Sequence, residues 1–177
     1  YLDTKHPIII ENLMGIKRRK GIIQKGKKPI LISDLKQLID VINKETVPDI
    51  KKLRNKTLLI IGFAGGFRRN EIVSLDIKDI EFVFEGVKIT LKKSKTDQFG
   101  EGMVKGIPHF EDSLYCPVKT LKHWINISKI KKGALFRRFI KGSKLSNNRL
   151  TDQSVALIIK DYLLKAGIDN KNYSGHS

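Results

Sequence analysis

An apolar run that ends at two glycines constrains this chain more than any other stretch. Residues 58–64 read Leu-Leu-Ile-Ile-Gly-Phe-Ala, which suits a buried helix and is too short to span a membrane. Gly65 and Gly66 follow, and glycine adopts the left-handed backbone of a helix end at little cost. The run therefore predicts a buried helix that stops at a defined point.

Two arginines and a carboxylate follow this break directly. Arg68 and Arg69 come first, and Glu71 stands three residues after Arg68. An arginine held at a turn beside a packed helix is fixed in space, and its planar guanidinium suits a phosphate. The same pair could be an ordinary surface ion pair worth only ~0.2–0.5 kcal/mol. Taken alone the pair favours the surface interpretation, so the choice depends on the rest of the chain.

The positive charge of the chain is large and unevenly placed. Lys and Arg total 35 against 18 acidic residues, which gives a net charge of +17. Codon bias in an AT-rich genome also raises lysine content, but it does not easily produce blocks without acidic residues. Residues 129–149 hold eight Lys or Arg and no Asp or Glu, and residues 1–32 hold eight against two. This placement favours a polyanionic partner, most simply nucleic acid.

Several other classes of protein are disfavoured by the composition. The single cysteine, Cys116, cannot form an intramolecular disulfide and fits a reducing, cytoplasmic compartment. The sequence contains no run of about 18 apolar residues, so it predicts no membrane span. The four histidines are scattered, and no cluster of acidic residues has the spacing of a two-metal nuclease, so we expect no metal and no cofactor.

The hydrophobic pattern predicts an α+β fold that is mainly helical and contains a small three-stranded antiparallel sheet. A basic, glycine-punctuated segment comes first, with a short helix near residues 8–14 and a flexible linker over 17–28. Ser33 is a good N-cap for the next helix. The remaining expected elements are a helix over 50–64, a helical turn ending near 75, strands over 80–84, 87–91 and 103–107, a helix from Pro117, an extended piece over 134–139 and a helix from Thr151 or Asp152 to Gly167.

The order of these segments resembles the catalytic domain of tyrosine recombinases, the phage-integrase type. Residues 66–72, Gly-Phe-Arg-Arg-Asn-Glu-Ile, resemble the first arginine box of that family, Gly-x-Arg-x-x-Glu-Ile/Leu. Residues 94–96, Ser-Lys-Thr, stand where the family keeps a catalytic lysine between its second and third strands. Residues 173–177 resemble the start of its second box, His-x-x-Arg. Further resemblances follow in the same order at residues 7–18, 74–80, 115–124 and 150–155.

The resemblance implies a role for each residue of the expected site. Arg68 would contact the scissile phosphate and stabilise the pentavalent transition state, and Glu71 would support the box structurally. Lys95 would protonate the departing 5′ oxygen, and His176 would assist proton transfer. In such enzymes a tyrosine attacks the phosphodiester and forms a 3′-phosphotyrosine link without metal or ATP.

The sequence also departs from the family pattern. The second arginine should stand three residues after His176, and the nucleophilic tyrosine farther on, which places both beyond Ser177. The tyrosines present all precede His176, and none takes the place of the nucleophile: Tyr1, Tyr115, Tyr162 and Tyr173. We therefore expect this chain alone not to cut DNA.

Other basic residues are expected to contact DNA without reading its sequence. Arg69 is either a surface charge or a contact to the DNA backbone, and strand alternation puts Lys93 on the same face as Lys95. The acid-free block should give salt-dependent, sequence-independent phosphate contacts. Its candidate residues are Arg137, Arg138, Lys141, Lys144 and Arg149.

The combined interpretation is a DNA-binding fragment of a site-specific recombinase or integrase. Residues 1–30 are expected to be the basic interdomain linker, or the end of a DNA core-binding domain, and residues 31–177 the front portion of the catalytic domain. The expected partners are double-stranded DNA and other recombinase subunits, with no small-molecule substrate. Two alternatives remain open: a non-catalytic DNA-binding remnant of a decayed integrase gene, and a basic RNA-binding protein, which would leave the ordered boxes unexplained.

Overall fold

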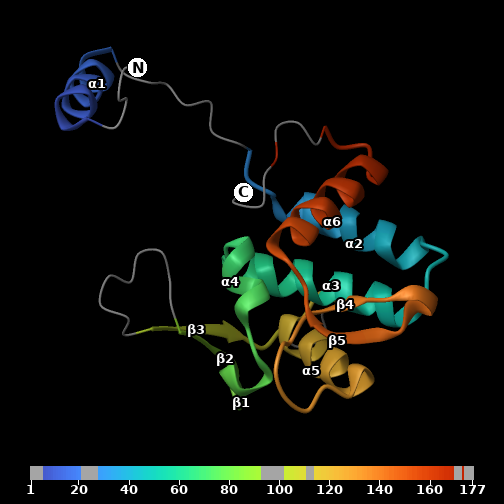
Figure 1. Cartoon of the computed structure of the whole chain (residues 1–177). Helices are drawn as coiled ribbons and strands as arrows, with labels where there is room; N and C mark the ends of the chain where they lie inside the picture. Colours follow the sequence, from blue (N-terminus) through green and yellow to red (C-terminus); the bar gives the residue numbers. More distant parts are fainter. Residues whose placement is uncertain (1–5, 21–27, 93–101, 111–113, 170–172, 174–177) are drawn as a thin grey trace.

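The computed structural model describes residues 6–20, 28–92, 102–110, 114–169 and 173 (Figure 1). The elements are α1 (Pro7–Lys20), α2 (Ile32–Lys44), α3 (Asp49–Ala64), α4 (Arg69–Ser74), the 3₁₀ turn η1 (Ile77–Asp79), β1 (Ile80–Val83), β2 (Gly86–Leu91), β3 (Met103–Pro108), α5 (Pro117–Ser128), β4 (Arg137–Phe139), the 3₁₀ turn η2 (Lys141–Ser143), β5 (Leu145–Arg149) and α6 (Asp152–Lys165). In the described parts of the chain, helices α1 to α4 precede a first small sheet, and α5 separates that sheet from a second one that α6 follows.

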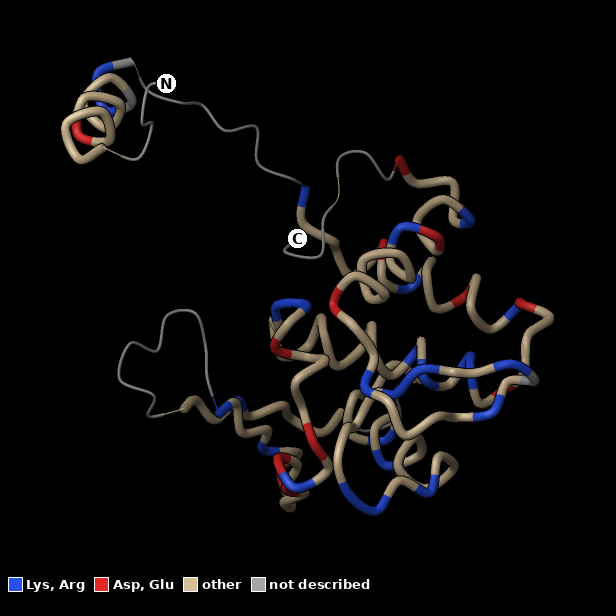
Figure 2. Tube along the Cα trace, in the orientation of Figure 1, with Lys and Arg blue, Asp and Glu red and all other residues tan. Residues whose placement is uncertain are grey.

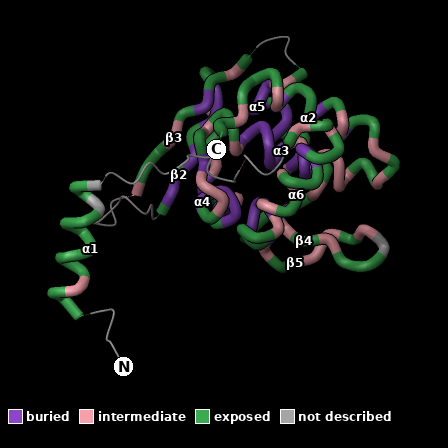
Figure 3. The backbone as a smooth tube through the Cα atoms, turned by 90° about the horizontal axis from the view of Figure 1, so that it is seen from above, coloured by how far each residue is buried: buried purple, intermediate pink, exposed green. Residues whose placement is uncertain are grey.

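Helix α3 is the central element because both of its sides are buried. Leu58 and Ile61 join a core cluster shared with α4, the first sheet and α5. Leu59 and Ile60 join a second cluster shared with α2 and α6. The buried trace of α3 is visible between these elements in Figure 3. Residues 58–61 of the apolar run are buried, whereas Phe63 near the end of the helix is 39% exposed, so the first part of the run determines where the core lies.

The three-stranded antiparallel sheet is confirmed, with strand order β1-β2-β3. Its register pairs Ile80 with Ile89 across β1 and β2, and Ile89 with Lys105 across β2 and β3. The inward face of β2 consists of Val87, Ile89 and Leu91, which are all buried. The alternation expected over residues 80–84 ends early, because Phe84 lies in the turn and is 99% exposed.

The second sheet was not expected. Strands β4 and β5 pair antiparallel, with Arg137 opposite Arg149 and Phe139 opposite Leu145. The extended piece expected over residues 134–139 is therefore one half of a hairpin. Strand β5 reads Leu-Ser-Asn-Asn-Arg, which has neither β-branched residues nor apolar alternation, so it gives no strand signal.

Buried polar contacts join this hairpin to α3. Arg54 is only 4% exposed, and its Nη1 donates to the carbonyl oxygen of Arg137 at 3.2 Å. Its guanidinium also lies 5.0 Å from the ring centre of Phe139, a cation–π contact. Burial lowers the pKa of Arg54 to about 10. The hairpin is thus held by a charged side chain from the central helix.

Helix ends differ from the expectations in two places. Helix α1 continues through Lys20, where the sequence suggested a linker from Lys17, because arginine and lysine are good helix formers. Helix α2 begins at Ile32, so Ser33 is not its N-cap. Asp34 supplies the acceptor instead, and the Leu31 N–H donates to its Oδ2 at 2.9 Å. Within the described ranges, no helix is both long enough and apolar enough to cross a bilayer.

Candidate nucleic-acid interface

The chain reverses direction between α3 and α4, and this turn places Arg68. The Gly65 N–H donates to the Ile61 carbonyl at 3.0 Å, and Gly66 has a left-handed backbone with φ of +54°. Phe67 then inserts into the core, where it is 8% exposed. A side chain on Gly65 would collide with the Phe67 ring, because an added Cβ would lie 2.2 Å from it. The turn therefore needs glycine, and it leaves Arg68 directly after a buried anchor.

Glu71 holds Arg68 through two contacts. Its Oε1 accepts a hydrogen bond from Arg68 Nη1 at 2.9 Å, and its Oε2 accepts one from the Arg68 backbone N–H at 2.9 Å. Glu71 is 4% exposed, whereas the Arg68 side chain is 39% exposed. Burial alone would raise the pKa of Glu71, but the Arg68 hydrogen bonds and the charges of Lys105 and Arg68 lower it below its usual value. Glu71 is thus a charged, buried support for a guanidinium that reaches solvent.

Lys105 is a neighbour of this box that the sequence alone does not indicate. Its Nζ donates to the carbonyl oxygens of Gly65 at 2.8 Å and Gly66 at 3.0 Å. The same ammonium lies 3.8 Å from Glu71 Oε2 and 4.5 Å from the ring centre of Phe67. A single lysine in a strand gives no signal in the sequence, because only the pairing of β3 with β2 brings it to the arginine box.

Three predicted residues, Lys93, Lys95 and His176, lie outside the described residues, so their expected roles stay predictions. The neighbouring Lys92 is described: its Nζ lies 3.2 Å from Asp79 Oδ1 and 3.4 Å from Asp76 Oδ2. The hydrogen bond to Asp79 is the main reason that the pKa of Lys92 is raised. The lysine that directly follows β2 is therefore paired with Asp79 of η1 and with Asp76 just before it.

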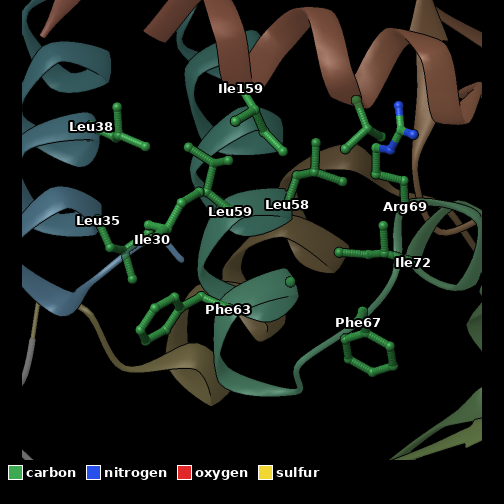
Figure 4. Close-up of a pocket in the computed structure, with 12 residues that line it drawn as sticks. Ile30, Leu35, Leu38, Leu58, Leu59, Phe63, Phe67, Arg69, Ile72 and Ile159 are labelled. Atoms are coloured by element: carbon green, nitrogen blue, oxygen red, sulfur yellow. The ribbon is translucent and has the colours of Figure 1, made fainter. Parts of the chain in front are cut away.

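Arg69 extends from the start of α4 toward α6 (Figure 4). It lines an apolar groove of about 70 Å³ together with Phe67 and Ile159, among others. Its Nε is buried and has no hydrogen-bond partner among the described residues. The two adjacent arginines therefore differ: Arg68 is paired with a carboxylate, and Arg69 lies against apolar side chains. A backbone-phosphate contact from Arg69 stays a prediction.

The β4–β5 hairpin presents most of the other predicted DNA contacts, and Figure 2 shows the basic residues along it. Lys141 and Lys144, at the turn, are exposed. Arg138 is exposed too, and its Nε donates to the Arg149 carbonyl at 3.2 Å. Arg137 is more constrained, because its Nε donates to the Ala134 carbonyl at 3.1 Å and its Nη1 to Asn147 Oδ1 at 2.9 Å.

Arg149 has a structural role that the sequence did not indicate. Its Nη1 donates to the carbonyl oxygens of Val73 and Leu75, and its Nη2 pairs with Asp76. Burial alone would raise the pKa of Asp76, but the contacts with Arg149 and Lys92 lower it. These bonds join the end of β5 to the end of α4. The DNA contact expected from Arg149 stays a prediction beside this role.

Two tyrosines have hydroxyl contacts within the fold. The Tyr162 hydroxyl donates to Glu45 Oε2 at 2.7 Å and accepts from Asn55 Nδ2 at 2.7 Å. Burial, and then the bond to Glu45, raise the pKa of Tyr162 to about 12. The Tyr173 hydroxyl lies 3.4 Å from Asp34 Oδ2. Over the described ranges, no group of three or more His, Cys, Asp or Glu side chains could hold a metal ion.

Comparison with known sequences matches most of this chain to one family. The model described as Phage integrase family matches residues 30–177. An Integrase/recombinase xerD homolog from Selenomonas ruminantium is 40% identical over 174 residues, which cover 98% of this chain and 50% of that protein. A Tyrosine recombinase XerD from Staphylococcus epidermidis is 25% identical over 175 residues, 97% of this chain and 55% of that protein. The chain thus spans about half the length of these curated relatives.

Comparison with solved structures shows the same fold. The XerA recombinase superimposes with a TM-score of 0.59 at 17% identity, over 99% of this chain and 58% of that chain. The XerH site-specific recombinase bound to palindromic difH substrate, in a post-cleavage complex, gives a TM-score of 0.61 at 19% identity. That match covers 87% of this chain and 40% of the recombinase.

Proposed function

This chain belongs to the phage integrase family, and on that premise we propose that it binds duplex DNA and supplies the arginine box of a tyrosine recombinase. The whole protein would cleave and rejoin DNA strands through a 3′-phosphotyrosine link, in site-specific recombination or integration. The relatives that match this chain are named as recombinases, and the XerH recombinase structure is a complex with its palindromic difH substrate. Neither metal nor cofactor takes part in the proposed chemistry.

The observation that carries the proposal is the geometry of Arg68. A buried glutamate accepts one hydrogen bond from its guanidinium and one from its backbone N–H, yet 39% of the side chain is exposed. A fixed cation suits a phosphodiester, because negative charge builds up on the non-bridging oxygens in the transition state. Such a donor needs no reorganisation when the charge develops. The arrangement therefore supports Arg68 as the phosphate-binding arginine and Glu71 as its support.

The remaining roles follow the family pattern. Lys95 would protonate the leaving 5′ oxygen and His176 would assist proton transfer. Lys93, Arg69 and the basic residues of the β4–β5 hairpin would contact the DNA backbone. Residues 1–30 would link this domain to a preceding DNA-clamping domain, and other recombinase subunits would share the DNA. The reaction would take place in the cytoplasm, where Cys116 would stay reduced.

A suicide-substrate assay tests the proposal, because a nicked duplex traps any covalent protein–DNA adduct. It compares the 177-residue chain with a longer version that carries downstream sequence, each with Arg68 and with Arg68→Ala. We expect an adduct from the longer version alone, formed ~10²–10³ times more slowly after Arg68→Ala. An adduct at an unchanged rate after that substitution would contradict the role of Arg68. If neither version forms an adduct but both bind DNA, the protein is a DNA-binding remnant.

A further inference from the structure

Lys105 occupies the end of α3, where backbone carbonyls lack partners within the helix. The last carbonyl groups of any helix are unpaired and carry partial negative charge, so a cation is favourable there. Lys105 brings that cation from another element, β3, and bonds to the Gly65 and Gly66 carbonyls on the two residues that turn the chain toward Arg68. The contact therefore joins the sheet to the turn itself.

The same ammonium also lies close to the support of Arg68. It is 3.8 Å from Glu71 Oε2, the oxygen that accepts the Arg68 backbone N–H. It covers the face of Phe67, the buried residue just before Arg68. The Lys105 side chain thus contacts residues 65, 66, 67 and 71. Together these residues determine the position of the Arg68 guanidinium.

We propose that Lys105 is a positioning residue, which fixes the arginine box from the sheet so that Arg68 is held ready for a phosphate. The proposal rests on the function proposed above for Arg68. Lys105 acts through Arg68 and does not contact the phosphate itself.

The exposure and hydrogen bonds of Lys105 favour a positioning role over direct contact with a phosphate. The Lys105 side chain is 20% exposed, against 39% for Arg68. A lysine has three N–H donors, and two of them already bond to carbonyl oxygens while the third side of the ammonium faces Glu71 and Phe67. Lys105 also stands opposite Ile89, which is fully buried, on the inward face of the sheet. The Lys105 side chain is therefore a structural part of the arginine box.

The test uses the 177-residue chain with Lys105→Met, which keeps the length of the side chain and removes the charge. Lys88→Met is the matched control, because Lys88 is exposed on β2 and pairs with Gly106. The first readout is the pKa of Glu71, from an NMR titration of its carboxyl carbon. We expect Lys105→Met to raise this pKa, since a nearby positive charge is lost, and Lys88→Met to leave it unchanged.

The second readout is DNA affinity in a double-mutant cycle with Arg68→Ala, followed by the anisotropy of a labelled duplex. Arg68→Ala should weaken binding about tenfold, the size of one charge-assisted hydrogen bond. Lys105→Met should weaken binding in the Arg68 protein but have no further effect once Arg68 is alanine. Lys105→Arg should bind like the original chain, because it keeps the charge. That variant also keeps the test decisive if Lys105→Met does not fold.

Each contrary outcome has a distinct meaning. If Lys105→Met weakens binding equally in both backgrounds and lowers the salt slope by ~0.9, Lys105 is itself a phosphate contact and the inference is wrong. If it changes neither the pKa of Glu71 nor the affinity, the inference is also wrong. If Arg68→Ala leaves affinity unchanged while Lys105→Met still shifts the pKa of Glu71, then Lys105 does act on the arginine box, and it is the proposed function of Arg68 that fails.

Discussion

At the scale of single residues, two adjacent arginines have opposite environments. Arg68 meets a carboxylate and solvent, while Arg69 turns toward α6 and buries its Nε among apolar side chains. The spacing in the sequence identified Arg68 as the paired arginine, because Glu71 stands one helical turn from Arg68 and lies on the same side of the helix. The burial of Arg69 could not be foreseen, since it depends on how α6 packs on α4.

Glu71 should make the stability of the fold depend on pH in a defined direction. Its pKa is lowered in the folded state, so its contribution is present above the unfolded pKa of ~4.3 and is lost as pH falls through the folded value. Glu71→Gln should therefore cost about 1.5–3 kcal/mol at pH 7, the value of bonds with a charged group. Urea unfolding, followed by the fluorescence of the buried Trp124, measures this.

The difference between the two proteins should shrink as pH falls below ~4.3 and through the lowered folded pKa of Glu71, because the carboxylate of the original chain then becomes protonated as well. Asp161→Asn is a suitable control, since this carboxylate is exposed and pairs only with Lys165 among the described residues. A Glu71→Gln cost that stays constant as pH falls from 7 through the acid range would show that charge on Glu71 does not stabilise the box.

At the scale of elements, long apolar patterns were predictable and polar pairings were not. The helix over residues 50–64, the first sheet and the helix from Pro117 follow from apolar periodicity, which reports which face a segment buries. The β4–β5 hairpin was missed because polar contacts hold it, through Arg54 from α3 and Arg149 at its end. Such contacts join residues far apart in sequence, so local pattern carries no trace of them.

The same limit applies to the candidate site. The positions of Arg68 and Glu71 came from a motif whose members are close in sequence. Lys105 stands 40 residues from Gly65, and its contact exists only because the register of the sheet places it there. The sequence thus predicted Arg68 and Glu71, which are close in the chain. The contribution of Lys105 from the sheet could be recognised only in the folded structure.

Arg149 should matter for stability more than an equally basic neighbour. Arg149→Met removes two bonds to backbone carbonyls and the pair with Asp76, which together join β5 to α4. Because its side chain is 39% exposed, solvent screens the pair, and we expect a loss of about 2 kcal/mol. Arg138→Met removes one exposed hydrogen bond and should cost less than about 0.5 kcal/mol.

Urea unfolding of both variants separates the two effects, and the pKa of Asp76 gives a second measurement. That pKa should rise after Arg149→Met, because the hydrogen bond and charge that lower it are gone. Equal stability losses for the two variants would mean that the hairpin is held by its own pairing and not by Arg149.

At the scale of the whole molecule, the net charge of +17 sets how tightly any polyanion is held, but the placement of the charge decides where. Each phosphate that the protein neutralises adds ~0.9 to the slope of log affinity against log salt. Replacing Lys141 and Lys144 at the hairpin turn by serine should therefore lower that slope by ~1.8 if both contact DNA. Neither replacement should unfold the protein, since both side chains are exposed.

The control removes the same charge elsewhere, with serine at Lys36 of α2 and Lys160 of α6, which are also exposed. If the hairpin is the DNA surface, its variant binds a labelled duplex with the smaller slope while the control keeps the original one. Equal slopes for the two variants would mean that the molecule attracts DNA by total charge alone. In that case the acid-free block of residues 129–149 would reflect base composition of the gene, and the DNA path would have to be sought around Arg68 instead.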